Sequence, residues 1–125
     1  MATNFSKKDM IKLQNLLRKS KKTITTAESC TGGLVASLIT KISGSSDIFN
    51  GSIVTYSNSI KNKELGVLNE SLDKFGAVSK QVVSEMLDGV LKKFEADFAI
   101  AISGVAGPNG GTKNKLVPKC GTNVW

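Results

Sequence analysis

Apolar residues recur with a helical period in three segments of the chain. In the first, Ser6 is placed to cap a helix and Phe5 to meet Met10 as a hydrophobic staple, and the pattern predicts a helix that ends near residues 19–22. The second segment follows the Gly32-Gly33 pair. The third begins at Ser79, a further N-cap, and its predicted apolar face comprises Val82, Val83, Met86, Val90, Leu91 and Phe94.

Between these helices lie short β-branched or apolar runs that predict strands. Residues 23–27 form the first, and residues 48–49 with 52–56 form the second. Residues 97–102 are almost continuously apolar, which is typical of a central strand covered on both faces. Residues 57–65 predict a short helix closed by Gly66, and a second short polar segment over 69–75 leads to Gly76.

The alternation of strands and helices predicts an α/β domain with a largely parallel sheet. Ligands of open sheets of this kind bind beyond the carboxyl ends of the strands. Three loops fall at such ends: residues 28–33, 56–61 and 103–111.

The first of these loops places hydroxyls, a thiol, a carboxylate and two glycines where a helix begins. A helix N-terminus offers free N–H groups and a positive dipole end, so this loop is a candidate seat for an anion or an oxyanion. The alternative is a well-capped helix whose glycines allow close packing.

Length and composition indicate one globular domain over residues 1–125, with 40% hydrophobic and 22% charged residues. No run of about 18 apolar residues is present, so no transmembrane helix and no membrane partner are expected. The first eight residues lack the apolar core of a secretory signal, which favours a cytoplasmic location.

The net charge of +7 favours an anionic ligand. Apart from Arg18 the basic residues are lysines scattered along the chain, and there is one Trp and one Tyr. Binding to nucleic acid is therefore not expected, because the interleaving of arginine and aromatic residues found in many such proteins is missing.

The chain contains no histidine, which excludes a Ser-His-Asp or Cys-His arrangement within it. The commonest metal ligand is also absent, and Cys30 and Cys120 are far apart in sequence. A catalytic base must be a lysine, a tyrosine or a carboxylate, and the two cysteines are expected to be free thiols.

A serine-lysine hydrolytic site satisfies these constraints. Ser29 lies just before a predicted helix, and Lys61 lies about one helical turn past Tyr56, where a desolvated lysine can take a proton. Tyr56 can relay or donate a hydrogen bond, and Ser103 at the end of the apolar strand can orient a substrate amide. Lys61 and Tyr56 also have ordinary interpretations, as a solvated lysine and a half-buried tyrosine. Cys30 is a rival to Ser29 as the nucleophile, although a cysteine next to a helix start is often buried and inert.

Five motifs in register resemble the CinA C-terminal domain family, whose members are known as nicotinamide-nucleotide amidases. The match runs from about Thr23 to Gly111. The motifs are Thr26-Ala27-Glu28-Ser29-Cys30-Thr31-Gly32-Gly33, Gly44-Ser45-Ser46, Val54-Thr55-Tyr56-Ser57-Asn58, Gly76-Ala77-Val78-Ser79 and Ser103-Gly104-Val105-Ala106-Gly107-Pro108 with Gly110-Gly111.

The resemblance implies a three-layer α/β/α sandwich that hydrolyses nicotinamide mononucleotide to nicotinate mononucleotide and ammonia, without metal or cofactor and often as a homodimer. Ser29 matches the nucleophile, Tyr56 and Lys61 the assisting pair, and Ser103 a supporting hydroxyl. The expected substrate contacts are Cys30, Thr31, Gly32, Gly33, Ser45, Ser46, Asn58, Gly104, Gly107 and Gly111.

The chain departs from the family pattern after Lys115. An extra Asn123 interrupts the expected Gly-Thr-Val-Trp, and the strand and helix expected next do not follow, so we expect a domain truncated at its C-terminus. An alternative function is therefore an inactive domain of the same family that binds a nucleotide or a partner chain. A weaker idea, suggested by the family's name and the basic charge, is a role connected with DNA.

Overall fold

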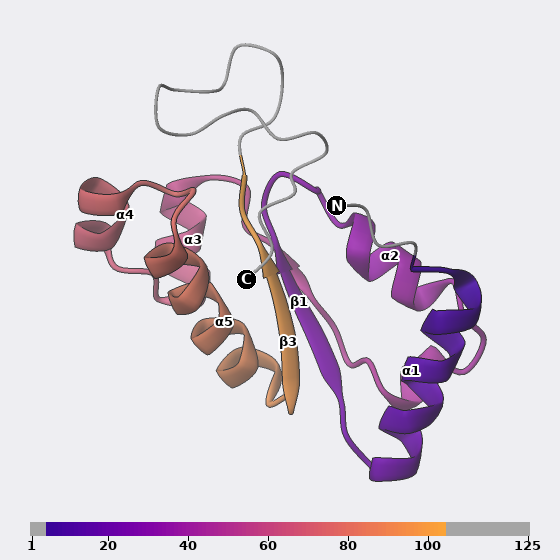
Figure 1. The fold of residues 1–125 in the computed structure, drawn as a ribbon. Helices are drawn as coiled ribbons and strands as arrows, with labels where there is room; N and C mark the ends of the chain where they lie inside the picture. Colours follow the sequence, from indigo (N-terminus) through magenta and orange to yellow (C-terminus); the bar gives the residue numbers. More distant parts are fainter. Residues whose placement is uncertain (1–4, 105–125) are drawn as a thin grey trace.

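A computed structural model describes residues 5–104 of the chain (Figure 1). In chain order its elements are α1 (Lys7–Ser20), β1 (Ile24–Glu28), α2 (Leu34–Thr40), the 3₁₀ turn η1 (Ser45–Asp47), β2 (Ile53–Val54), α3 (Asn58–Leu65), α4 (Asn69–Phe75), α5 (Lys80–Phe94) and β3 (Phe98–Ile102). The fold is the predicted α/β type, with a parallel sheet of three strands and five α-helices in the described part. The predicted truncation beyond Lys115 lies outside the described residues.

The central strand of the described sheet is β1, in the order β2-β1-β3. All five residues of β1 are buried, and both neighbours run parallel to it. Within residues 5–104, β3 lies beside β1, and the prediction that residues 97–102 form a central strand stays a prediction. Phe98, at the start of β3, is 53% exposed.

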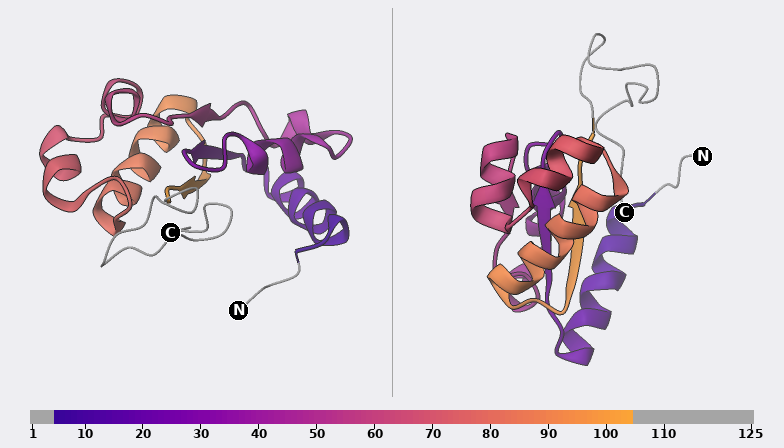
Figure 2. Two further views of the ribbon diagram at one scale, coloured as in Figure 1. Left: turned by 90° about the horizontal axis from the view of Figure 1, so that it is seen from above. Right: turned by 90° about the vertical axis from the view of Figure 1, so that its left-hand side faces the viewer.

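The sheet is covered by helices on both faces, which confirms the three-layer sandwich (Figures 1 and 2). α1 and α2 cover one face, and α3, α4 and α5 lie over the other. Because side chains alternate along a strand, Ile24 joins the core under α1 while Ala27 joins the core under α5. The larger core comprises Ala27, Leu65, Val67, Leu72, Val82, Val83, Met86, Val90 and Ala101.

Helix starts agree with the sequence. Ser6 forms a capping box with Asp9, and the hydroxyls of Ser57 and Ser79 accept hydrogen bonds from main-chain N–H groups three residues on. The second predicted strand is shorter than expected, because only Ile53 and Val54 pair as a strand. Ile48 is instead a fully buried core residue whose carbonyl accepts from Ile24 N–H.

Helix α3 is packed closely against α5 at Gly89. A Cβ at Gly89 would overlap the carbonyl oxygen of Leu65, the last residue of α3, and would lie 2.8 Å from its carbonyl carbon. This close approach fixes the position of the end of α3 against α5. Lys61 belongs to α3, so its position depends on the same contact.

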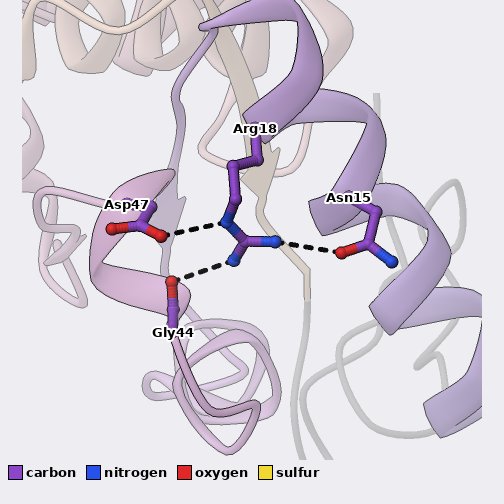
Figure 3. A network of polar contacts seen from close by, with 4 residues as sticks. All are labelled: Asn15, Arg18, Gly44 and Asp47. Carbon is purple, nitrogen blue, oxygen red and sulfur yellow. Dashed lines mark hydrogen bonds and ion pairs between the residues drawn. The ribbon is translucent and has the colours of Figure 1, made fainter.

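A polar network ties α1 to the turn after α2 (Figure 3). Arg18 Nε donates to Asp47 Oδ2 at 2.9 Å, and the remaining guanidinium nitrogens donate to Gly44 O and Asn15 Oδ1, each at 3.0 Å. The network holds η1 beside the amino end of β1, where Ile24 N–H donates to Ile48 O.

Candidate active site

Ser29 and Lys61 meet at the carboxyl end of the sheet. Ser29 directly follows β1, and its N–H donates to Ile102 O of β3 at 3.0 Å. Glu28, the residue before it, faces α2, so the alternation of side chains turns Ser29 toward α3. Lys61 extends from α3 and is only 1% exposed, with its Nζ 3.1 Å from Ser29 Oγ.

The ammonium group of Lys61 is surrounded by oxygen acceptors and no carboxylate. Nζ donates to the main-chain carbonyls of Thr55 at 2.9 Å and Tyr56 at 3.1 Å, in addition to Ser29 Oγ. None of the ion pairs within residues 5–104 includes Lys61. Burial therefore lowers the pKa of Lys61, and the nearby Cys30 thiol offsets this only in part.

The turn from Ser29 to Gly33 is closed by the carboxylate of Glu28. This side chain is fully buried and accepts hydrogen bonds from Val35 N–H and Ala36 N–H at the start of α2. The expectation that this helix start offers its N–H groups to an external anion is thus wrong for these two amides, because Glu28 already occupies them. Burial raises the pKa of Glu28, but its hydrogen bonds outweigh that effect and the net pKa is lowered.

Cys30, the rival nucleophile, is half-buried beside Ser29. Burial raises the pKa of the Cys30 thiol, and the negative charge of Glu28 raises it further, against the opposing effects of nearby main-chain N–H groups and Lys61. The thiol therefore stays protonated near neutral pH, where it is a weak nucleophile. Lys61 is hydrogen-bonded to the hydroxyl of Ser29, which favours Ser29 as the activated group.

A pocket of about 270 Å³ opens over this pair. Its lining residues are Ser29, Cys30, Tyr56, Asn58, Lys61, Ala77, Ser103 and Gly104. Ser103 is buried at the end of β3, and its hydroxyl donates to Ala77 O at 2.8 Å, so the oxygen lone pairs stay available to a ligand. The pocket thus brings together the end of β1, the start of α3 and the end of β3, as the three-loop prediction required.

Tyr56 contributes to the site differently from the expectation. Its contact with Lys61 is through the main-chain carbonyl, and its side chain is 67% exposed at the pocket. Asn58, in the first turn of α3, is exposed beside it. These two side chains are placed to meet a ligand that extends out of the pocket.

Other predicted contact residues have different positions. The Thr31 hydroxyl donates to Glu28 Oε1 at 2.7 Å, and Gly32 and Gly33 adopt positive φ in the turn itself. Ser45 and Ser46 lie in η1, next to Ile48, whose carbonyl accepts from Ile24 N–H at the amino end of β1, and neither serine lines the pocket. Gly107 and Gly111 lie outside the described residues.

Two parts of the site were not predicted from the sequence. The carbonyls of Thr55 and Tyr56 orient Lys61, and main-chain groups leave no signal in side-chain identity. The specific role of Glu28 was also missed, although a carboxylate between a strand and a helix start is a recognisable capping signal.

Two further features of the described residues bear on ligands. Across residues 5–104, no three His, Cys, Asp or Glu side chains are grouped so that they could hold a metal ion. In the same range, every helix is too short or too polar to span a bilayer. The homodimer and the cytoplasmic location expected from the sequence stay predictions.

By its geometry the protein is an α/β sandwich with a buried serine-lysine pair at the carboxyl end of its sheet. Its sequence matches the CinA C-terminal domain family over residues 7–122. The chain belongs to that family.

Individual relatives agree with this assignment. The chain is 60% identical over 101 residues to a CinA-like protein of Prochlorococcus marinus (strain MIT 9312) and 53% identical over 102 residues to one of Thermotoga neapolitana. These matches cover 81% and 82% of this chain, but only 24% and 25% of those proteins. The chain therefore spans about a quarter of the length of these relatives.

Solved structures show the same fold. The competence/damage inducible protein CihA from Agrobacterium tumefaciens superposes with a TM-score of 0.87 at 39% identity, covering 94% of this chain and 71% of that one. A competence-damaged protein (CinA) superfamily protein from Escherichia coli has a TM-score of 0.86 at 33% identity, with 94% and 69% covered.

Proposed function

We propose that this domain hydrolyses the carboxamide of nicotinamide mononucleotide, giving nicotinate mononucleotide and ammonia. Membership of the CinA C-terminal domain family supports this substrate, and the pocket supports the reaction class. The observation on which the proposal depends is the 3.1 Å contact between Lys61 Nζ and Ser29 Oγ in a buried site without a carboxylate partner for the lysine.

The contacts of Lys61 suit a neutral amine as the general base. A neutral amine has two N–H donors and one lone pair. The carbonyls of Thr55 and Tyr56 can only accept, so they take both N–H groups. In the structure Nζ donates to Ser29 Oγ, and the Ser29 hydroxyl donates to Tyr56 O at 3.4 Å. When Lys61 loses its proton, a lone pair replaces the N–H group that points at Ser29 Oγ, and the hydroxyl can turn to donate to Nζ. Burial favours this neutral form by lowering the pKa of Lys61.

The reaction proceeds in two balanced stages. Ser29 Oγ attacks the amide carbon and its proton passes to Lys61 Nζ, which then gives that proton to the departing nitrogen, so that ammonia leaves and an acyl ester remains on Ser29. A water molecule next attacks the ester, Lys61 accepts a proton from it and returns one to Ser29 Oγ, and the carboxylate product is released. No redox or metal step is required.

The volume of the pocket indicates which part of the nucleotide it receives. A volume of about 270 Å³ is slightly below the roughly 300–1,000 Å³ of typical ligand pockets, which suits the carboxamide-bearing ring better than the whole nucleotide. Ser103 Oγ can accept a hydrogen bond from the amide N–H₂. The ribose phosphate then extends past Tyr56 and Asn58 at the mouth.

The proposal is tested by measuring ammonia released from nicotinamide mononucleotide by the purified chain. Ser29→Ala and Lys61→Met should each abolish release while the circular dichroism spectrum stays unchanged. Free nicotinamide, which lacks the ribose phosphate, serves as the comparison substrate and should react more slowly.

Folded protein that releases no ammonia would refute the proposed amidase activity. If such protein still binds the nucleotide in calorimetry, and Ser29→Ala binds equally well, the inactive binding domain is the better description.

A further inference from the structure

Glu28 is a buried carboxylate that neither the proposed proton transfer nor the substrate contacts use. Its Oε1 accepts from Thr31 Oγ1 at 2.7 Å and Val35 N–H at 3.0 Å. Its Oε2 accepts from Ala36 N–H at 2.9 Å and Thr26 Oγ1 at 3.1 Å. No ion pair within residues 5–104 includes this side chain.

Burying a carboxylate is costly unless donors satisfy its charge. Here four donors do so, two of them main-chain N–H groups in the first turn of α2. A carboxylate is suited to this position because both its oxygens act only as acceptors. Glutamine would present an N–H₂ group to donors and would lose at least one of these hydrogen bonds.

Three of these contacts, from Thr31, Val35 and Ala36, close a loop in the chain that contains the proposed nucleophile. The loop runs from Glu28 to Ala36, and Ser29 is the first residue inside it. Gly32 and Gly33, with φ values of 62° and 105°, have no side chains that could anchor the turn. The position of the turn therefore depends on Glu28 and on the main-chain bonds of Ser29 to Ile102 and Gly32. The Ser29 hydroxyl adds two bonds of its own, accepting from Lys61 Nζ and donating to Tyr56 O.

We infer that Glu28 is a positioning residue for the proposed reaction, which fixes Ser29 Oγ opposite Lys61 Nζ by tying the turn after β1 to the start of α2. This inference rests on the proposed function for its catalytic consequence. Glu28 and Ser29 are adjacent and face opposite sides of the sheet, so a shift of the Glu28 side chain rotates the peptide that carries Ser29.

The test compares Glu28→Gln with Glu85→Gln, a matched variant remote from the pocket. Glu85 also accepts several hydrogen bonds, from Leu68 N–H at 2.8 Å and from Ser71 and Gln81 at 2.6 Å each. Both variants should lower the thermal midpoint. Misplacing a reacting group by about 1 Å can cost about 100-fold, so Glu28→Gln should lower kcat by that order with KM changed less than about threefold.

Glu85→Gln should keep kcat within about twofold of the wild type, since its contacts hold α4 and not the turn. A kcat for Glu28→Gln within that same range, or an equal loss in both variants, would overturn the inference. If Glu28→Gln does not fold, Thr31→Val takes its place. It removes one donor to Glu28 and should lower kcat by about tenfold, and an unchanged kcat would again overturn the inference.

A second readout separates this inference from the proposed function. The alkylation of Cys30 by iodoacetamide, followed by mass spectrometry of its peptide, requires no substrate. Release of the turn should expose Cys30 and speed its alkylation by about tenfold in Glu28→Gln, with a smaller contribution from the lost Glu28 charge, and the rate should stay unchanged in Glu85→Gln. If the wild type releases no ammonia, the proposed function fails, and equal alkylation rates would then overturn the inference as well.

Discussion

Gly89→Ala tests how packing at one point of α5 controls the site. An alanine Cβ would overlap Leu65 O and lie 2.8 Å from Leu65 C and 2.9 Å from its Cα. Carbon atoms in contact are normally separated by about 3.5–4.0 Å, so the end of α3 must withdraw by about 0.7 Å or more. The obstructing atoms are main chain, so no side-chain rotation relieves the overlap.

The expected loss of stability follows from two opposed effects. Overpacking of this kind costs about 3 kcal/mol at the upper end of its usual range, while replacing glycine by alanine inside a helix gains about 1 kcal/mol. The net loss of about 2 kcal/mol corresponds to a thermal midpoint lower by about 6–12 °C for a domain of this size. Because Lys61 lies one helical turn before Leu65, its Nζ should also move away from Ser29, with a loss in kcat of about tenfold.

Thermal unfolding followed by circular dichroism measures the first effect, and ammonia release well below the midpoint measures the second. Ser84→Ala, at an exposed position of the same helix, is the matched control and should be neutral or slightly stabilising. A Gly89→Ala protein as stable and as active as the wild type would show that α3 and α5 do not approach this closely.

Three further predictions concern the site and its frame. The value of kcat/KM should rise with pH through the lowered pKa of Lys61, because the neutral amine is the active form. If the midpoint of this pH profile lies at or above the ordinary pKa of lysine, burial does not lower the pKa of Lys61 as argued. Ser103→Ala removes the donor to Ala77 O, so it should lower the free energy of unfolding by about 1–3 kcal/mol and raise KM for the nucleotide. Denaturant titration measures the first effect and initial rates the second. An unchanged KM would remove Ser103 from the substrate contacts. Arg18→Ala should cost only about 0.5–1 kcal/mol by releasing η1 (Figure 3), because its contacts are exposed to solvent. It should leave kcat unchanged because η1 lies at the amino end of β1, and a loss of activity in folded protein would refute that placement.

Local rules were enough to predict most of the elements. Ser6, Ser57 and Ser79 are placed as helix caps by their hydroxyls, and Gly66 ends α3 at a φ of 70°. These signals depend on neighbouring residues only, so the sequence contains them in full. The second strand was overestimated, because Ile48 has the same apolar character in a core position as it would have in a strand.

The candidate site was predictable in its residues but not in its arrangement. The absence of histidine limited the base to lysine, tyrosine or a carboxylate, and the loops after the strands indicated where Ser29, Lys61 and Ser103 belong. The sequence could not show that Lys61 is buried, since a lysine in a short polar helix is ordinarily solvated. Its burial depends on the contact of α3 with α5 at Gly89 and on two main-chain carbonyls.

The sequence by itself determined the α/β class, the helix boundaries and the chemistry left open to the site. Tertiary structure alone decided that β1 is the central strand of the described sheet, that Glu28 occupies the first amides of α2, and that Ser45 and Ser46 lie at the far end of the sheet from Ser29. The physical reason is the range of the interactions involved. Capping and periodicity act within a few residues, whereas the pairing of strands and the burial of a charge depend on segments that are distant in sequence and meet only in the folded chain.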